Sequence, residues 1–282
     1  MTCRSSIFND FCLLMVSAAL WMSCSSVPDG FEMLDEQVSK KLHSFGSGDL
    51  QVGQSQYILL RWEQQGNMGD TLRLLQEALV DTGALAGIVI NSTIHRDIQS
   101  MEDGAMLEYW APAAAFKGGS GMDKKRYKVT IEKCFADKRA AAHFLATSAA
   151  EGLRSEEECM DLFTALYPEL HWMAFNDLRL GFKTRSQGDS VLADRNVHIA
   201  YNTFLLGGEQ LDSLTEMEFP FGKSGQLLPA MQWGLSKMRA GEEAIILTPS
   251  QWAFGQEGSP ENKIPAHTPL FWNVKVLAVQ TN

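Results

Sequence analysis

Residues 238–255 read MRAGEEAIILTPSQWAFG, and residues 101–118 read MEDGAMLEYWAPAAAFKG. Both stretches hold a methionine, a glycine three residues later, and a proline eight residues after that glycine. The aligned pairs are Met101 with Met238, Gly104 with Gly241, and Pro112 with Pro249. The offset of about 137 residues is too long for a solenoid, whose repeats are roughly 20–50 residues. The sequence therefore predicts a duplicated domain.

The repeat extends beyond this segment in both directions. Upstream, Trp62 stands ten residues before Leu72, as Tyr201 stands ten residues before Leu211. Downstream, YKVTI at 127–131 matches WNVKV at 272–276, after a longer loop in the second copy. An aromatic residue also follows each proline, at Phe116 and Phe254. Repeated positions thus span residues 62–131 in the first copy and 201–276 in the second.

Each copy is predicted to consist mainly of β-strands with one short helix. Dense runs of β-branched, aromatic and aliphatic residues bounded by glycines indicate strands. These runs are 57–62, 105–111, 127–131, 178–184, 197–205, 243–247 and 270–278. Helical spacing of apolar residues marks 94–101 and 229–237. Strands with one inserted helix indicate an α+β class with antiparallel sheets.

Between the copies the pattern becomes helical. Residues 136–171 begin with an alanine-rich stretch that Gly152 is suited to end, followed by a capping box of Ser155 with Glu158 and a second helix at 156–167. We predict a packed helical connector here, and a dimerising arm is the alternative. The expected domain boundaries are 1–24 for a signal peptide, 25–40 for a polar tether, 41–135 for the first copy, 136–171 for the helical connector and 172–282 for the second copy.

Composition argues against a nucleic-acid partner. The chain of 282 residues has a net charge of −10, with 45% hydrophobic and 21% charged residues. Binding to phosphates needs clustered Lys and Arg. The nearest basic cluster, Lys124–Arg126, is predicted to be a solvated hairpin turn. The six histidines show no metal-ligand spacing, so no metal and no cofactor are expected.

The N-terminus has the pattern of an export signal. Arg4 precedes an apolar run at 11–22, which is too short for a stable membrane span. Ser23 and Cys24 then resemble the lipobox of bacterial lipoproteins, in which the cysteine carries the lipid. The position three before Cys24 is Trp21 instead of the usual aliphatic residue. Ordinary secretion and an uncleaved anchor remain as alternatives.

Cleavage before Cys24 would leave two further cysteines, Cys134 and Cys159. One disulfide in an oxidising compartment and two free buried thiols are equally compatible with the sequence.

The second copy resembles the FKBP-type peptidyl-prolyl cis-trans isomerases. The elements that carry the resemblance keep the family's order and spacing over about 85 residues. They are VHIAY (197–201), GGEQLDS (207–213), FPFG (219–222), LLPAM (227–231), GLSKMRAG (234–241), ILTP (246–249), WAFG (252–255) and IPAHTPLFWNV (264–274). The resemblance implies a twisted antiparallel sheet wrapped around a short helix, with an apolar pocket between them.

The resemblance also assigns the pocket residues. Tyr201 and Asp212 match the wall tyrosine and the pocket carboxylate, and Leu228 matches the residue whose backbone amide binds the ligand. The other matched positions are Met217, Leu227, Met231, Phe254, Ile264 and Trp272. Because a carboxylate within an apolar segment needs a partner, Tyr201 is expected to pair with Asp212.

Two pocket positions depart from the family. The floor, usually Trp, is Met231, and Phe254 lacks the phenolic hydroxyl that usually donates to the ligand. These changes predict reduced activity rather than none. The alternative is a domain that binds peptides without catalysis.

The first copy matches less well. Its equivalent apolar positions are Trp62, Ile90, Ile94, Phe116 and Tyr127. Arg73 falls where Asp212 falls, and Asn91-Ser92 replaces Leu228-Pro229. This copy is predicted to be non-catalytic.

The resemblance thus implies an isomerase that assists the folding of exported proteins. Its expected partners are proline-containing polypeptides, and a lipid would anchor it to a bacterial envelope membrane. The rival hypothesis is a non-catalytic peptide-binding or chaperone lipoprotein within an envelope complex. The oligomeric state is not predicted.

Overall fold

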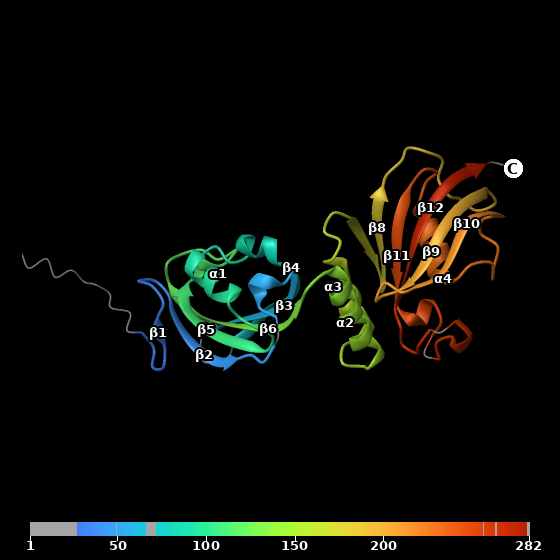
Figure 1. Cartoon of the computed structure of the whole chain (residues 1–282). Coiled ribbons are helices and arrows are strands. Elements are labelled where there is room, and N and C mark those ends of the chain that lie inside the picture. The colour runs from blue at the N-terminus through green and yellow to red at the C-terminus, as the bar shows by residue number, and fades with distance from the viewer. Residues whose placement is uncertain (1–26, 49, 66–71, 256, 263, 281–282) are drawn as a thin grey trace, which may run out of the picture.

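The structure is a computed structural model that describes residues 27–48, 50–65, 72–255, 257–262 and 264–280. Within this part of the chain, two antiparallel sheets of six strands lie on either side of a pair of helices (Figure 1). The signal peptide and Cys24 lie outside the described residues.

The first sheet has the strand order β1-β2-β5-β6-β3-β4. Its strands are β1 (Glu32–Met33), β2 (Ser39–Phe45), β3 (Tyr57–Gln65), β4 (Leu72–Asp81), β5 (Ala105–Pro112) and β6 (Lys124–Phe135). Helix α1 (Ser92–Gln99) lies between β4 and β5 in the chain.

The second sheet follows the same path, with the order β7-β8-β11-β12-β9-β10. Its strands are β7 (His171–Phe175), β8 (Leu178–Thr184), β9 (Asn196–Leu205), β10 (Gln210–Pro220), β11 (Glu243–Thr248) and β12 (Leu270–Gln280). Helix α4 (Pro229–Leu235) connects β10 to β11, as α1 connects β4 to β5. The two sheets therefore share one topology.

Strand pairing reproduces the sequence repeat residue by residue. Trp62 lies opposite Val129, and Tyr201 lies opposite the aligned Val274. The repeated glycine has a structural reason in both copies, because Gly104 and Gly241 have φ values of +76° and +84°. That region of backbone conformation favours glycine. The amide of Gly104 donates to Ile131 O at 2.8 Å, and that of Gly241 donates to the equivalent Val276 O at 2.7 Å.

The two helices between the sheets have well-defined ends. Helix α2 spans Lys138–Ala150, and Gly152 terminates it two residues later. The φ of Gly152 is +67°, and its amide donates to Ala149 O at 3.0 Å. The next amide, from Leu153, donates to Ser148 O at 2.9 Å, which completes a Schellman motif. Helix α3 (Glu156–Thr164) begins with the expected capping box of Ser155 and Glu158.

This helical pair packs against both sheets through one buried cluster. Leu145 of α2 and Phe163 of α3 are almost fully buried in it. The first sheet contributes Leu59 and the second sheet contributes Leu247 and Phe271. Burial of each such side chain contributes about 1.5–3 kcal/mol, so the helices are part of the folded core.

Three expectations about the chain were wrong. The polar tether at 25–40 does not extend to residue 40, because β1 and the start of β2 belong to the first sheet and Val38 is fully buried. Helix α3 ends at Thr164, three residues before Tyr167, where the chain turns toward Pro168. Lys124–Arg126 begins strand β6 and does not form a turn.

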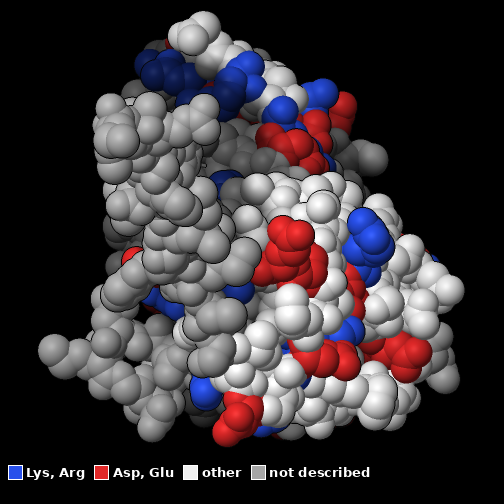
Figure 2. All heavy atoms as spheres, turned by 90° about the vertical axis from the view of Figure 1, so that its left-hand side faces the viewer, with Lys and Arg blue, Asp and Glu red and all other residues white. Residues whose placement is uncertain are grey.

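Acidic and basic side chains are intermixed on the face of the first domain seen in Figure 2. Within this domain Lys40 pairs with Asp97 at 2.8 Å, and Arg154 of the helical connector pairs with Glu77 of β4 at 2.7 Å. This mixture fits the lack of a basic stripe in the sequence. Among the described residues, no helix is long and apolar enough to cross a membrane.

Candidate functional site

One row of residues crosses the second sheet and forms the base of a cavity. Asp212 of β10 lies opposite Thr203 of β9, which lies opposite Trp272 of β12. Trp272 in turn lies opposite Ile246 of β11. Directly opposite residues project from the same face of a sheet. Tyr201 stands two residues before Thr203 on β9, so it joins them on this face.

Helix α4 covers the same face at close range. A Cβ atom added to Gly234 would lie 2.3 Å from Ile246 Cδ1, so only glycine allows this approach. The helix begins with Pro229 at its first position, where the missing N–H needs no intrahelical partner. The preceding Leu228 and the buried Met231 are thereby brought over the sheet.

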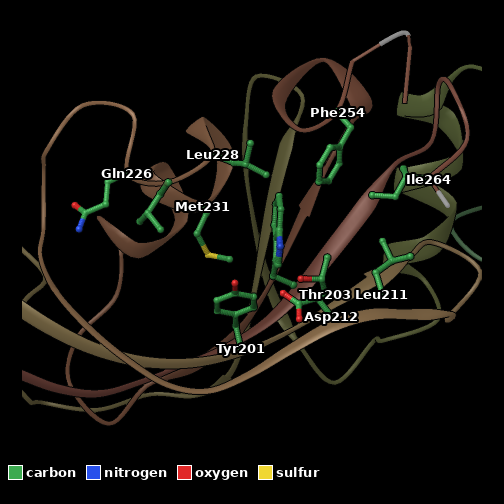
Figure 3. Close-up of a pocket in the computed structure, with 11 residues that line it drawn as sticks. Tyr201, Thr203, Leu211, Asp212, Gln226, Leu228, Met231, Phe254 and Ile264 are labelled. Atoms are coloured by element: carbon green, nitrogen blue, oxygen red, sulfur yellow. The ribbon is translucent and has the colours of Figure 1, made fainter. Parts of the chain in front are cut away.

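The space between helix and sheet is a cavity of about 390 Å³. Figure 3 shows Tyr201, Thr203 and Asp212 on one side of it and Leu228 and Met231 on another. The Tyr201 hydroxyl points into the cavity. The complete lining consists of Tyr201, Thr203, Leu211, Asp212, Gln226, Leu227, Leu228, Met231, Phe254, Ile264 and Trp272. Seven of the eleven lining residues are apolar, and Tyr201, Thr203, Asp212 and Gln226 add polar groups. The volume and this mixed lining fit a small ligand group or a peptide side chain.

Eight of the nine pocket residues expected from the sequence line this cavity, and Met217 is the exception. Its half-buried side chain packs against the core of the second sheet. A register shift between Leu214 and Met217 in β10 separates it from the pocket row.

Sequence reasoning missed Thr203, Leu211 and Gln226. Thr203 had a usable signal, because it follows Tyr201 by two residues on one strand. Gln226 lies in a loop, so its place depends on the tertiary fold alone.

Asp212 is exposed at the rim, whereas the sequence analysis expected a carboxylate within apolar surroundings. It accepts a hydrogen bond from the Ser213 amide at 2.7 Å. Burial raises the pKa of Tyr201, and the negative charge of Asp212 raises it further. Tyr201 therefore keeps its proton at neutral pH. The expected pairing of the two side chains is not a hydrogen bond, because the Asp212 carboxylate bonds to the Ser213 amide and no such bond joins it to Tyr201 among the described residues.

A comparison with known protein families finds a match within this second domain. Residues 188–277 match the family model described as FKBP-type peptidyl-prolyl cis-trans isomerase. The chain is similar to "Peptidyl-prolyl cis-trans isomerase FKBP15-1" of Arabidopsis thaliana, with 30% identity over 109 residues, which cover 36% of this chain and 70% of the relative. This chain belongs to the FKBP-type peptidyl-prolyl cis-trans isomerase family.

Other FKBP-type proteins are also similar to this chain. "FK506-binding protein 1" of Saccharomyces cerevisiae is 31% identical over 86 residues, which cover 29% of this chain and 75% of that protein. A solved peptidyl-prolyl cis-trans isomerase structure from Pseudomonas syringae covers 52% of this chain and 98% of its own, with 20% identity and a TM-score of 0.37.

The indole ring in this cavity belongs to Trp272, a residue of the sheet. Where a Trp floor is usual, helix α4 supplies Met231, whereas Trp272 of β12 is only 3% exposed and lines the same cavity. Phe254 also lines the cavity but has no hydroxyl to offer a ligand. Compared with the usual family pattern, the cavity lacks one hydrogen-bond donor, the phenolic hydroxyl at position 254. It has a flexible Met231 side chain where a Trp ring is usual.

The first domain has a smaller cavity of about 300 Å³ at the equivalent place. Trp62, Gln64, Phe116 and Tyr127 line it, and they occupy the positions of Tyr201, Thr203, Phe254 and Trp272. The rings of Phe116 and Tyr127 lie 4.4 Å apart.

Other equivalent positions in the first domain have diverged. Ile94 is fully buried in the core, whereas Ile90, which directly precedes the Asn91 cap of α1, is exposed. Arg73 lies opposite Gln64, as Asp212 lies opposite Thr203, and its side chain is outside the described part of the chain.

The structure decides between the two predictions for the cysteines. Cys134 and Cys159 are free and buried. Burial raises the pKa of Cys134 to about 12 and that of Cys159 to about 11. No cluster of metal-ligating side chains occurs among the residues that the structure describes.

Proposed function

We propose that the second domain catalyses cis-trans isomerisation of Xaa-Pro bonds in polypeptides. The observation that carries this proposal is the apolar cavity of Tyr201, Met231 and Trp272, with Asp212 at its rim, inside the segment that matches the family. This chemistry needs no nucleophile, metal or cofactor.

The barrier to rotation is about 18–20 kcal/mol and arises from amide resonance. At the transition state the C–N bond is twisted, the resonance is lost and the carbonyl oxygen carries less negative charge. An apolar cavity solvates this form better than the planar amide. The cavity therefore lowers the barrier by binding the transition state more tightly than the substrate.

Individual residues have distinct parts in this scheme. Trp272 and Met231 enclose the proline ring, and the Tyr201 hydroxyl and the amide of Leu228 orient the neighbouring peptide groups. Asp212 at the rim keeps the Tyr201 hydroxyl protonated, because its charge disfavours loss of that proton.

A peptide assay tests the proposal. The relaxation rate of a short Xaa-Pro peptide is measured with the full mature chain, with Asp212→Ala, and with Glu218→Ala as the control. Glu218 is an exposed acid on the same strand, outside the cavity. We expect catalysis by the wild type and the control and a clear loss in Asp212→Ala. A wild-type rate equal to the uncatalysed rate contradicts the proposal, and retained peptide binding would then favour the non-catalytic alternative.

We further propose that the first domain is a diverged FKBP-like copy without catalytic activity and that the helical pair connects the two. The shared topology and the equivalent cavity support this proposal, as does the arginine at position 73. Any activity that remains in Asp212→Ala would then be unaffected by Trp62→Ala in the first domain. Residual activity sensitive to Trp62→Ala would contradict it.

The proposed site of action is a bacterial cell envelope, where the enzyme assists the folding of exported proteins. The lipobox-like sequence ending at Cys24 supports this placement. Mass spectrometry of the N-terminal peptide tests it. We expect a lipid-modified Cys24, and an unmodified Cys24 would remove the anchor.

A further inference from the structure

The wall residue Phe254 belongs to a turn that is organised around Ser250. The turn begins with η4 (Ser250–Trp252), directly after strand β11 and Pro249. The carbonyl oxygen of Ser250 accepts hydrogen bonds from the amides of Ala253 at 2.8 Å and Gly255 at 2.7 Å. These two amides flank Phe254 in the chain. The position of the Phe254 ring in the cavity therefore depends on where Ser250 is held.

Ser250 is held by a residue from the helical pair. The carboxylate of Glu156 accepts from the Ser250 amide at 2.6 Å through Oε2 and from the Ser250 hydroxyl at 2.7 Å through Oε1. Ser250 is 4% exposed, and the Glu156 side chain is 20% exposed. Hydrogen bonds to a charged acceptor are about twice as strong as neutral ones, and burial shields this pair from water.

Two further contacts tie the same region to segments outside the pocket. The carboxylate of Asp177, in the turn between β7 and β8, accepts from Gln251 Nε2 and lies 3.4 Å from Trp252 Nε1. His267 Nδ1 lies 3.9 Å from Glu156 Oε1, three residues after the pocket residue Ile264. Glu156 thus contacts both loops that complete the cavity wall.

Glu156 is the first residue of α3, and both Glu156 and Asp177 precede the segment 188–277 that matches the family. A pocket wall is therefore anchored by residues outside the matched domain.

We propose that Glu156 is a positioning residue for the pocket, which couples the helical pair to Phe254 through Ser250. The consequence for catalysis rests on the proposed isomerase function, whereas the consequence for peptide binding does not. The isolated second domain would accordingly have a less ordered pocket than the full chain.

The test compares Glu156→Ala with Glu156→Gln and the control Glu157→Ala in the full mature chain. Glutamine can keep both contacts, with its oxygen accepting from the amide and its nitrogen donating to the hydroxyl. Glu157 is the next residue of the helix, is exposed and faces Arg179 at 3.5 Å. Three quantities are measured, namely kcat/KM for an Xaa-Pro peptide, the Kd of that peptide, and the NMR shifts of the Ser250 amide and the Phe254 ring.

We expect Glu156→Ala to lower kcat/KM and weaken peptide binding about tenfold, because misplacement by about 1 Å can reduce a rate up to about 100-fold. The Ser250 amide and Phe254 ring shifts would change, Glu156→Gln would restore most of the affinity, and Glu157→Ala would match the wild type. Loss of stability alone would not move these readouts at temperatures well below unfolding.

Unchanged affinity and unchanged shifts in Glu156→Ala overturn the proposal. If the wild type binds the peptide but does not catalyse, the isomerase proposal fails while the affinity and NMR comparison still tests Glu156. If Glu156→Ala does not fold, Ser250→Ala removes only the hydroxyl contact. An unchanged Phe254 shift in that variant overturns the proposal.

Discussion

The contact between Gly234 and Ile246 sets the distance between α4 and the sheet, and Gly234→Ala perturbs it directly. The added Cβ would lie 2.3 Å from Ile246 Cδ1 and 2.7 Å from Cγ1, whereas ordinary contacts begin at 3.4 Å. Ile246 is fully buried, so its side chain has little room to move. The helix must then retreat by about 1 Å or Ile246 must change its rotamer.

The expected magnitude is the difference between two opposing effects. Overpacking of a core costs about 1–3 kcal/mol. Replacing glycine by alanine within a helix recovers about 1 kcal/mol. The balance is a loss of roughly 0–2 kcal/mol in the free energy of unfolding. Because α4 carries Met231, the cavity should widen and the affinity for an Xaa-Pro peptide should fall as well.

A double-mutant cycle with Ile246→Val isolates this contact. Valine lacks the Cδ1 atom at the closest point, and Ile246→Val alone should cost about 0.5–1.5 kcal/mol. In the double variant the new methyl group occupies the vacated space, so the combined loss should be smaller than the sum by about 1 kcal/mol or more.

Urea unfolding gives the free energy of unfolding of the wild type, the two single variants and the double variant. Gly87→Ala is the matched control. A Cβ on Gly87 would meet no atom within 4 Å. We expect this control to be neutral or slightly stabilising. If Gly234→Ala is more stable than the wild type by the full helix gain of about 1 kcal/mol, or if the two substitutions are additive, close packing does not set the position of the helix.

Three further outcomes are expected. Phe254→Tyr restores a phenolic donor in the cavity and should tighten binding of an Xaa-Pro peptide by about 0.5–1.5 kcal/mol, measured by calorimetry; unchanged affinity would show that the hydroxyl does not reach the ligand. Cys134 and Cys159 should resist N-ethylmaleimide at pH 8 in the folded chain and react in denaturant, because burial raises their pKa values to about 12 and about 11; fast labelling of the native protein contradicts this. Hydrogen bonds from the amide and hydroxyl of Ser155 hold the pKa of Glu158 below its ordinary 4.5. The ionised Glu158 therefore stabilises the fold above pH 4.5, and this contribution is lost as the pH falls through the lowered pKa. Glu158→Gln should make the free energy of unfolding depend less on pH in this acidic range, and an unchanged dependence would refute this.

Local patterns predicted much of the secondary structure. The strand at 178–184 was predicted with the bounds that the structure has, and the capping box and the Gly152 helix end were also confirmed. Each of these features depends on neighbours within a few residues in the chain. Strands β4 and β10 were not predicted, because Arg73, Glu77, Asp212 and Glu216 interrupt their apolar residues. Pairing with β3 and β9 stabilises them instead.

The sequence by itself determined the duplication, the register of the repeat and most of the pocket residues. The duplication and its register follow from glycine at positive φ and from alternation along strands, which are local in the chain. The pocket residues followed from the resemblance to the FKBP family, which the order of the matched elements carries. Only the tertiary structure decided that Thr203 joins the pocket row, that Met217 lies outside it and that Asp212 is exposed at the rim. It also brought Glu156 to Ser250, 94 residues later in the chain. No local pattern encodes such a contact, because it depends on the packing of the helical pair against the second sheet.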